Sequence, residues 1–512
     1  NIVDENREIR DVVRYLRGDD DDGDEKDGTV VAIDFRDAFR SVLLRWFKLV
    51  MEFLGVPRVF RAWFWSFYKD LSIVIVINNA ISGKILVKRG FMEGSCPSMA
   101  AFVTAVIPLL NRLEKNIEGI RINEFSNKKK LCGFADDLKL FLRNAEEIHT
   151  AYDIIVRFQN VSGLSMHMDP GRQKCQALCF GSHRQYQFWP VWISRKDIVN
   201  ILGVLYSNVK EKSLEQVNSE NVFNKVMKKL FAATGIRGTI IQKTIYANVF
   251  LLSKVWYVAQ SIILDKKTLE KLDKKINNFI FAGENERPVR AIVYRSRAVG
   301  GLQLICLTTQ ARALMLKGML KQQTERDAHA NSEGTVYGNK KDLNKILSLN
   351  VRFRQVKGIY GILLKEKIGS EGNLIPSRSE KKNPLVDWET AWKNWKGLRG
   401  VTPEIKCFAW KLLQDMLEIP SRRHRGGQSK DCNTQVYDEE LNEMICCGNL
   451  GDIKHMFAKC GAVRTKFDSW LVFLERFLGS LISTEQILTL SFQHHIRKRN
   501  RIAIWGTSMA LF

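Results

Sequence analysis

Two adjacent carboxylates stand between two apolar runs in the segment KLCGFADDLKLFL, which extends from Lys130 to Leu142. An apolar run, a two-residue acidic turn and a second apolar run predict a β-hairpin with Asp136 and Asp137 at its tip. The pair alone is ambiguous because aspartate is a common turn residue. For the hairpin by itself, a surface turn is a simpler account than a catalytic site.

A third carboxylate makes a catalytic site the better account. Asp34 ends the run VVAID, whose β-branched residues are typical of a buried strand. Three carboxylates at neighbouring strand ends would supply the oxygen ligands that hard divalent cations prefer, and bound cations would offset the repulsion between adjacent aspartates. Two Mg²⁺ ions, or Mn²⁺ in their place, can promote in-line phosphoryl transfer. The pattern therefore predicts a two-metal centre.

The elements that must position these carboxylates alternate irregularly along the chain. Apolar periodicity predicts helices over 39–54, 59–69 and 98–116, and strands within SIVIVIN and ISGKILVKRG, before the hairpin is reached. Such an order predicts an α+β domain built on an antiparallel sheet with packed helices.

From about Ser213 the pattern becomes helical. The segment KTLEKLDKKINNFIFAG places apolar residues on one helical face and lysines mainly elsewhere, and Gly283 ends it. A solvated lysine face accounts for this pattern, and so does a face that follows nucleic-acid phosphates. The polar stretch from Gln322 to Lys341 is consistent with a flexible connection.

Composition narrows the class of partner. The chain has 512 residues, is 45% hydrophobic and 26% charged, and carries a formal net charge of +24. This excess favours a polyanionic partner, with nucleic acid ahead of an anionic membrane surface. Long apolar runs and a signal-peptide pattern are missing, which argues against membrane spanning and secretion. Ten irregularly spaced cysteines suit a reducing compartment, so an intracellular protein is expected.

Three motifs together resemble the reverse transcriptases of non-LTR (LINE) retrotransposons. VAIDFRDAFRSV resembles their first palm motif, GFADDLKLFL resembles their second catalytic motif, and VKRGFMEGSCPSMAAF between them is similar to the glycine motif usually written RGxxQGxPLSP. Their order and separations also fit the family. The resemblance implies a right-hand polymerase palm, a helical thumb and a mostly α-helical C-terminal region. It also implies an RNA-directed DNA polymerase that extends a DNA 3′-hydroxyl on an RNA template with deoxynucleoside triphosphates.

The resemblance also implies roles for individual residues. Asp34, Asp136 and Asp137 would hold the two Mg²⁺ ions, with the backbone carbonyl of Phe35 as a further ligand. Phe39 matches the aromatic residue that blocks a ribose 2′-hydroxyl, although a core phenylalanine accounts for it as well. The glycine motif, where a bare backbone lets the nascent base pair approach, corresponds to Arg89, Gly90, Glu93 and Gly94.

Later segments extend the resemblance with varying strength. SGLSMHMDPGRQKCQALCFG resembles the next palm motif, in which Lys174 matches a lysine that can protonate the leaving pyrophosphate. A surface lysine is an equally good account of Lys174. NILGVLYS is similar to the hairpin that grips the primer strand, built here on Leu202 and Gly203. NNFIFAG, GGLQLICL and IKCFAWKLL resemble the thumb and the region after it.

The C-terminal cysteines resemble a degenerate zinc knuckle of the kind that follows many LINE reverse transcriptases. CCGNLGDIKHMFAKC has the spacing C-x7-H-x4-C at Cys447, His455 and Cys460. Zinc requires four ligands, usually opened by a C-x2-C pair. Met444 stands in the place of the first cysteine, Cys446 is too close, and the distant Cys432 is a candidate for the missing ligand. A small helical tail with buried thiols is the alternative, and the basic segment HHIRKRNR suggests nucleic-acid contact.

Some positions depart from the family pattern. Asp37 and Arg40 stand where lysine and aspartate are usual, Glu93 replaces a glutamine, and the proline–leucine pair is shifted to Cys96 and Pro97. The fingers are largely missing, because NIVDENREIRDVVRYL resembles only the helix that ends them, and we expect truncation at both ends. The resulting alternative function is a catalytically inactive remnant that binds nucleic acid.

The resemblance divides the chain into four regions. We expect a palm with a fingers remnant over 1–183, a primer-grip hairpin and helical thumb over 184–290, a helical linker over 291–425, and the degenerate knuckle and basic tail over 426–512. The expected partners are an RNA template, a DNA primer or target and deoxynucleoside triphosphates, without a membrane. The expected location is the nucleus or cytoplasm, in ribonucleoprotein form.

Overall fold

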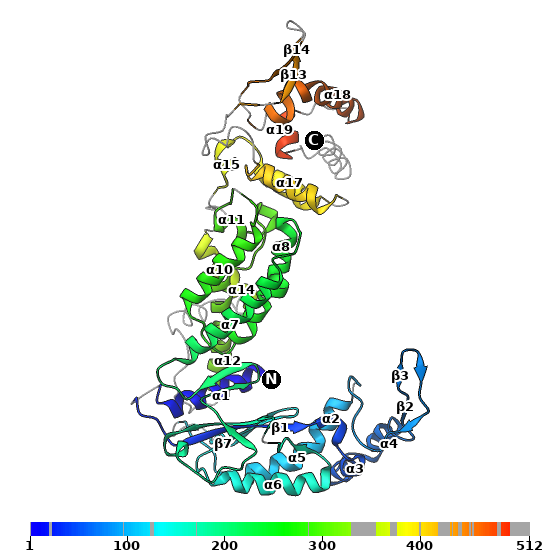
Figure 1. Cartoon of the computed structure of the whole chain (residues 1–512), viewed down its shortest axis with the longest axis vertical. Helices are drawn as coiled ribbons and strands as arrows, with labels where there is room; N and C mark the ends of the chain where they lie inside the picture. The colour runs from blue at the N-terminus through cyan, green and yellow to red at the C-terminus, as the bar shows by residue number, and fades with distance from the viewer. Residues whose placement is uncertain are drawn as a thin grey trace. The chain divides into compact units, whose positions relative to one another are not determined.

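The computed structural model divides into two compact units, whose elements are labelled in Figure 1. Unit 1 comprises 1–221, 257–265 and 315–348, and unit 2 comprises 222–256, 266–314 and 349–512. The residues that the structure describes are 2–19, 23–95, 97–122, 127–169, 171–284, 286–328, 355–368, 376–398, 401–417, 431–432, 434–438, 443–449, 452, 455–478 and 483–491.

Unit 1 is built on a six-stranded sheet in the order β10-β9-β1-β7-β6, with β8 also paired to β1. The strands are β1 (Gly28–Arg36), β6 (Leu131–Phe134), β7 (Asp137–Leu142), β8 (Ser165–Met166), β9 (Cys175–Phe180) and β10 (Ile193–Arg195). All pairs are antiparallel except β10 with β9. The expected antiparallel sheet is therefore mixed, because residues 181–192 provide the long connection that a parallel pair requires.

Helices cover both faces of this sheet (Figure 1). On one face, α5 (Ser98–Asn116) contacts α3 (Leu44–Phe53) and α6 (Glu147–Ser162). The alternate residues Val31 and Ile33 of β1 join Phe102 of α5 in one buried cluster on that side. On the other face lies α1 (Ile2–Arg17), so close that a Cβ on Gly28 would meet the Leu16 side chain at 2.6 Å. The central strand is consequently buried on both faces.

The helix predicted over 39–54 is interrupted. Its two parts are α2 (Ala38–Ser41) and α3, and the backbone is extended at Val42 and Leu43 between them. The break has a long-range cause, because Leu43 bridges to Arg89 and the Val42 carbonyl accepts the Gly90 N–H. The helix predicted over 59–69 is α4 (Arg58–Ser66), and the one predicted over 98–116 is α5.

A narrow ribbon follows α4. Strand β2 (Ser72–Ile73) pairs with β5 (Ile85–Leu86), and β3 (Val76–Ile77) pairs with β4 (Ala80–Ile81). The tip is formed by Asn78 and Asn79 with φ values of 48° and 66°, the left-handed turn that favours asparagine in two-residue hairpins. The residues of these four strands are exposed.

Unit 1 also contains a second hairpin, formed by β11 (Ile198–Ile201) and β12 (Val204–Ser207). Its turn consists of Leu202 and Gly203. Around it lie α1, the first part of α7 (Leu214–Ala232) and the end of α9 (Ser253–Ala259). Helix α12 (Leu307–Ala328) begins in unit 2 and continues into unit 1.

The described part of unit 2 is mostly helical. Its helices include α8 (Ile240–Tyr246), α10 (Lys266–Ile280), α11 (Arg290–Tyr294), α14 (Val356–Ile368), α15 (Arg378–Lys382), α16 (Trp388–Gly397), α17 (Pro403–Leu413), α18 (Gly461–Leu478) and α19 (Thr484–Thr489). One hairpin pairs β13 (Gln435–Asp438) with β14 (Glu443–Cys446). Buried hydrogen bonds stabilise this unit. The Trp410 indole and the Gln414 side-chain amide both donate hydrogen bonds to the Gly300 carbonyl.

Helix α10 has the amphipathic pattern expected from its sequence. The apolar face is buried and consists of Leu269, Leu272, Ile276 and Phe279. The exposed residues include Lys267, Lys271, Lys274 and Lys275. Within the expected flexible stretch 322–341, residues 322–328 belong to α12 and the others lie outside the described residues, as does the basic segment 494–501. Among the described helices, none is long and apolar enough to cross a membrane.

Candidate functional site

Strand pairing brings the three predicted carboxylates to one end of the sheet. The β1–β7 register places Asp34 directly opposite Asp137. Phe134 also pairs with Asp137, so the two-residue turn consists of Ala135 and Asp136, with Ala135 at a φ of 55°. The prediction that Asp136 and Asp137 together form the turn is thus wrong by one residue. Asp137 instead begins β7, because Ala135 adopts the left-handed conformation at the first turn position.

The three carboxylates influence one another electrostatically. Burial raises the pKa of Asp136, and the negative charges of Asp137 and Asp34 raise it further. A bound cation would relieve this unfavourable charge, and carboxylate oxygens are suitable donors for Mg²⁺. Among the described residues, the three aspartates do not form a group with converging donor atoms. Their side chains would therefore need to turn toward one another to share metal ions.

Two cationic side chains beside the carboxylates were missed by sequence reasoning. Lys139 is buried, and its Nζ donates to the Asp137 carbonyl at 2.8 Å and lies 3.7 Å from Asp137 Oδ1. Burial lowers the pKa of Lys139, although the charge of Asp137 opposes the shift. His167 places Nε2 3.8 Å from Asp34 Oδ2, an ion pair only when the imidazole is protonated. The nearly continuous apolar run around Lys139, typical of a strand that is buried on both faces, was the one signal in the sequence that this lysine is buried.

The remaining palm residues lie near the same strand ends. Phe35 is buried and pairs with Met166 of β8, so it is near the carboxylates, and a metal-binding role for its carbonyl stays a prediction. Lys174 is exposed and directly precedes Cys175, whose Sγ accepts the Asp34 N–H at 3.5 Å. The structure therefore brings Lys174 to the same end of the sheet as Asp34.

The glycine motif is joined to the first palm motif by backbone hydrogen bonds. The Phe91 N–H donates to the Phe39 carbonyl at 2.7 Å, and the Gly90 N–H donates to the Val42 carbonyl at 2.8 Å. Gly90 has a φ of +87°, and a Cβ there would lie 2.6 Å from the Arg40 carbonyl oxygen. Only glycine satisfies both the backbone conformation and this close approach.

Arg40 and Glu93, which both depart from the family pattern, form an ion pair at this junction. Arg40 donates from Nε to Glu93 Oε1 at 2.9 Å and from Nη2 to Oε2 at 3.3 Å. The guanidinium hydrogen bond and charge lower the pKa of the Glu93 carboxyl. The carboxylate at Glu93 is therefore ionised but compensated. Cys96, the other shifted position, lies outside the described residues, whereas Pro97 directly precedes α5.

Phe39 is half-buried and stacks on Phe102, with ring centroids 4.5 Å apart. This position is compatible with both accounts of Phe39, because one face packs on the core and part of the ring stays accessible. Arg89 is exposed and pairs with Leu43, and Gly94 is exposed with no atom near its Cβ position. The predicted nucleotide-binding residues consequently line one connected region of unit 1.

The predicted primer-grip turn has both residues in left-handed conformations. Leu202 has a φ of 48° and Gly203 a φ of 80°. The Tyr257 hydroxyl donates to the Leu202 carbonyl at 2.5 Å, and Asn6 Nδ2 approaches the same oxygen at 3.4 Å. Sequence reasoning missed Asn6 and Tyr257, because each is distant from the turn along the chain.

A second candidate centre lies in unit 2, where four potential metal ligands gather with their donor atoms within 4.8 Å of one another: Cys432, Cys447, His455 and Cys460. Cys447 Sγ is 3.3 Å from His455 Nε2, and the Sγ atoms of Cys432 and Cys460 are 3.8 Å apart. Three thiols and one imidazole are a suitable donor set for tetrahedral zinc. Cys432 lies in this group and could replace the first cysteine, which the sequence motif lacks.

Local backbone pairing explains how Cys432 reaches this centre. The Gly448 N–H donates to the Cys432 carbonyl, and the Cys447 N–H donates to the Thr434 carbonyl at 2.9 Å. Burial opposes ionisation of the Cys447 thiol, but hydrogen bonds with Asn449, Cys460 and Cys432 outweigh it and lower the thiol's pKa. A lowered pKa favours the thiolate that zinc binds. The side chains of Met444 and Cys446 lie outside the described residues.

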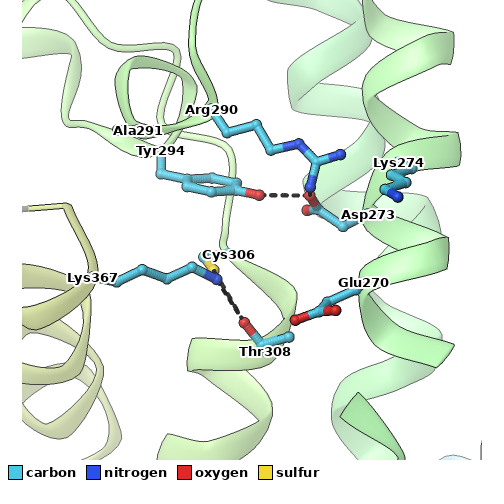
Figure 2. Close-up of a pocket in the computed structure, with 9 residues that line it drawn as sticks. All are labelled: Glu270, Asp273, Lys274, Arg290, Ala291, Tyr294, Cys306, Thr308 and Lys367. Atoms are coloured by element: carbon cyan, nitrogen blue, oxygen red, sulfur yellow. Dashed lines mark hydrogen bonds and ion pairs between the residues drawn. The ribbon is translucent and has the colours of Figure 1, made fainter. Parts of the chain in front are cut away.

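A cavity of about 270 Å³ also lies in unit 2 (Figure 2). Asp273 is buried there, accepts a hydrogen bond from the Tyr294 hydroxyl at 2.7 Å and forms an ion pair with Arg290 at 3.0 Å. Lys367 Nζ donates to Thr308 Oγ1 at 2.9 Å on another side of the cavity. Two carboxylates, Asp273 and Glu270, offset most of the positive charge of the lining, so the cavity gives no clear preference for an anion.

Comparisons with known proteins bear on unit 1. Residues 5–206 match the family described as reverse transcriptase (RNA-dependent DNA polymerase). An uncharacterized 149 kDa protein of transposon TX1 from Xenopus laevis is 21% identical over 275 residues, which cover 52% of this chain and 20% of that protein. The chain thus spans only a small part of this relative. These two findings support the resemblance to non-LTR retrotransposon reverse transcriptases.

One solved structure has a distant likeness. Telomerase from Candida albicans, in complex with a fragment of telomeric RNA, is 10% identical with a TM-score of 0.31, covering 68% of this chain and 53% of its own. A likeness at this level carries no argument about the fold.

Proposed function

Residues 5–206 are a reverse transcriptase domain, and on this premise we propose that the chain is the RNA-directed DNA polymerase of a non-LTR retrotransposon. It would extend a DNA 3′-hydroxyl on an RNA template with deoxynucleoside triphosphates. The observation that carries the proposal is the pairing of Asp34 with Asp137 at adjacent strand ends, with Asp136 next to them in the turn. Three neighbouring carboxylates repel one another, and bound cations would offset this repulsion.

Each neighbouring residue would have a role in the reaction. Asp34, Asp136 and Asp137 would bind two magnesium ions, which when bound activate the primer hydroxyl and neutralise the leaving pyrophosphate. Phe39 would exclude a ribose 2′-hydroxyl by its bulk. Lys174, exposed at the same end of the sheet, would give a proton to the pyrophosphate.

Nucleic-acid binding would extend beyond the carboxylates. The exposed lysines of α10 and the chain's net charge of +24 suit contacts with phosphates. We propose that the helices within 184–290, α8 and α10 among them, act as the thumb, and that Cys432, Cys447, His455 and Cys460 bind zinc. The protein would work in a ribonucleoprotein particle in the nucleus or cytoplasm.

Primer extension tests the proposal. Wild-type chain, a DNA primer on an RNA template, the four deoxynucleoside triphosphates and Mg²⁺ should give template-dependent product. Asp136→Ala should lower the rate at least about a hundredfold, since it removes charge stabilisation made in the transition state. Asp153→Asn, an exposed carboxylate of α6, is the matched control.

The alternative function has a different outcome in the same assay. A wild-type chain that gives no product, yet binds RNA with an affinity that falls steeply as salt rises, would be an inactive nucleic-acid-binding remnant. Product that survives in Asp136→Ala would also contradict the proposal, because it would place the activity elsewhere.

A further inference from the structure

The turn between β11 and β12 is held in an unusual backbone conformation. Leu202 has a φ of 48° although it is not glycine, and Gly203 follows at 80°. A leucine in the left-handed region is unfavourable and persists when its surroundings determine it. The contacts that do so come from outside the hairpin.

The Leu202 carbonyl is the point where these contacts meet. The Tyr257 hydroxyl donates to it at 2.5 Å, and Asn6 Nδ2 approaches it at 3.4 Å. Asn6 Nδ2 also donates to the Tyr257 hydroxyl oxygen at 3.1 Å. A Cβ on Gly203 would lie 3.0 Å from the Tyr257 ring, so the ring packs against the turn while its hydroxyl binds it. Gly203 itself is exposed.

The two anchoring residues are themselves firmly placed. Asn6 is buried, and the buried Tyr206 hydroxyl donates to its carbonyl at 2.8 Å and contacts its Oδ1 at 3.0 Å. On β12, the Leu205 N–H donates to the side-chain oxygen of Asn218, and the Asn218 amide donates to the Leu205 carbonyl. The hairpin is therefore fixed from α1, α9 and α7, and its turn has little freedom to shift.

The same helix that carries Asn6 also reaches the carboxylate hairpin. Helix α1 contacts β6 as well as β12. Helix α1 therefore connects the hairpin with the Leu202–Gly203 turn to the hairpin that carries Asp136 and Asp137.

We propose that Asn6 and Tyr257 are positioning residues that fix the Leu202–Gly203 turn relative to the three aspartates, so that a primer strand lying on the turn presents its 3′ end at the correct distance. This inference rests on the proposed polymerase function. Neither residue needs to touch the substrate. Small misplacements of a reacting group lower rates steeply, so the anchor should affect the chemical step more than binding.

Single-nucleotide incorporation separates these effects. Tyr257→Phe keeps the ring against Gly203 and removes only the hydroxyl. We expect the maximal incorporation rate to fall about tenfold, with the dissociation constant of the primer–template duplex and the melting temperature near the wild-type values. Asn6→Ala should lower the incorporation rate in the same way but should also lower the melting temperature, because the Asn6 side chain is buried and binds the Tyr206 hydroxyl. The double variant should be less than additive in rate because both residues bind one carbonyl.

Tyr15→Phe is the matched control, since Tyr15 lies on α1 with its ring under Lys26 Nζ at 4.1 Å, away from the turn. A wild-type chain without activity would overturn the proposed function. An active wild type with an equally active Tyr257→Phe would overturn this inference alone. A Tyr257→Phe protein that loses duplex binding in proportion to its rate would overturn it as well, because the residue would then serve affinity or folding.

Discussion

Arg40 and Glu93 form a two-point ion pair between the first palm motif and the glycine motif. Both positions carry residues that depart from the family pattern, and in the structure each compensates the other. The pair lies on a junction already closed by the hydrogen bonds from Gly90 and Phe91. A carboxylate at Glu93 repels phosphate groups in its neighbourhood, and the ion pair with Arg40 offsets part of its charge.

The first prediction concerns this pair. Arg40→Glu should lower deoxynucleotide incorporation roughly tenfold, because two carboxylates would then face each other between the first palm motif and the glycine motif. The exchanged double variant, Arg40→Glu with Glu93→Arg, should recover most of the rate. Glu93→Gln, which restores the family's residue, should remain close to wild type. Steady-state incorporation of one nucleotide measures all four proteins.

Lys212→Glu is the control for this series, because it reverses a charge in another exposed ion pair, with Glu220. It should leave incorporation unchanged. An exchanged variant no more active than Arg40→Glu would show that the ion pair does not matter to function.

The second prediction follows from the raised pKa of Asp136. A carboxyl group whose pKa is higher in the folded state opposes folding above that pKa, and the effect disappears below the unfolded pKa, near 3.9. In EDTA, Asp136→Asn should therefore melt at a higher temperature than wild type at pH 7. The difference should shrink as the pH approaches 4. Thermal melting at several pH values measures it.

Magnesium should reverse this order. A cation that binds the folded wild type raises its melting temperature, and Asp136→Asn should respond less because one ligand is lost. Asp153→Asn should match wild type with and without Mg²⁺. An equal response of wild type and Asp136→Asn would argue against a metal ligand at this position.

Local sequence patterns predict several elements of both units. The strand that carries Asp34, the apolar runs around Asp136 and the buried face of α10 each have a periodicity that identifies them without any partner. The hairpin turn was misplaced by one residue because the left-handed conformation of Ala135 has no marker such as glycine.

Features set by distant partners could not be predicted. The break between α2 and α3 depends on Arg89 and Gly90, and the anchors of the primer-grip turn come from Asn6 and Tyr257. The candidate zinc site could be predicted only in part. Its motif identified three ligands, but only the pairing of residues around β13 brings Cys432 beside them.

The third prediction concerns sugar selection. Phe39→Val shortens the side chain while keeping an apolar residue, and it should raise the rate of ribonucleotide relative to deoxynucleotide incorporation at least about tenfold. Phe102→Leu is the matched variant, because it removes the stacking partner from beneath Phe39. It should lower stability more and selectivity less. Competition between the two nucleotide types measures the ratio, and an unchanged ratio in Phe39→Val would leave this residue only a core role.

The fourth prediction separates two constraints on glycine. Gly90 and Gly94 both have positive φ, at 87° and 80°, but only a Cβ on Gly90 meets other atoms, at 2.6 Å from the Arg40 carbonyl oxygen. Gly94→Ala should lower the free energy of unfolding by about 1 kcal/mol from backbone strain. Gly90→Ala should lower it by about 2–4 kcal/mol, as steric overlap adds to the strain. Urea denaturation measures both, and equal losses would contradict the close approach.

The fifth prediction tests the Cys432 centre. The 512-residue chain purified without chelator should contain one bound zinc, and Cys432→Ser and Cys447→Ser should each lose it, because three ligands hold the ion weakly. Cys407→Ser, at a buried free cysteine of α17, is the matched control and should keep the metal. Elemental analysis by mass spectrometry gives the zinc content of each protein.

Acid should release the metal, because protons compete for the thiolates and the imidazole. The lowered pKa of Cys447 helps this residue stay a ligand as the pH falls. If wild type contains no zinc and Cys432→Ser melts like wild type, the four side chains are simply buried thiols and an imidazole. Zinc bound by wild type and equally by Cys432→Ser would instead assign the fourth ligand to another residue.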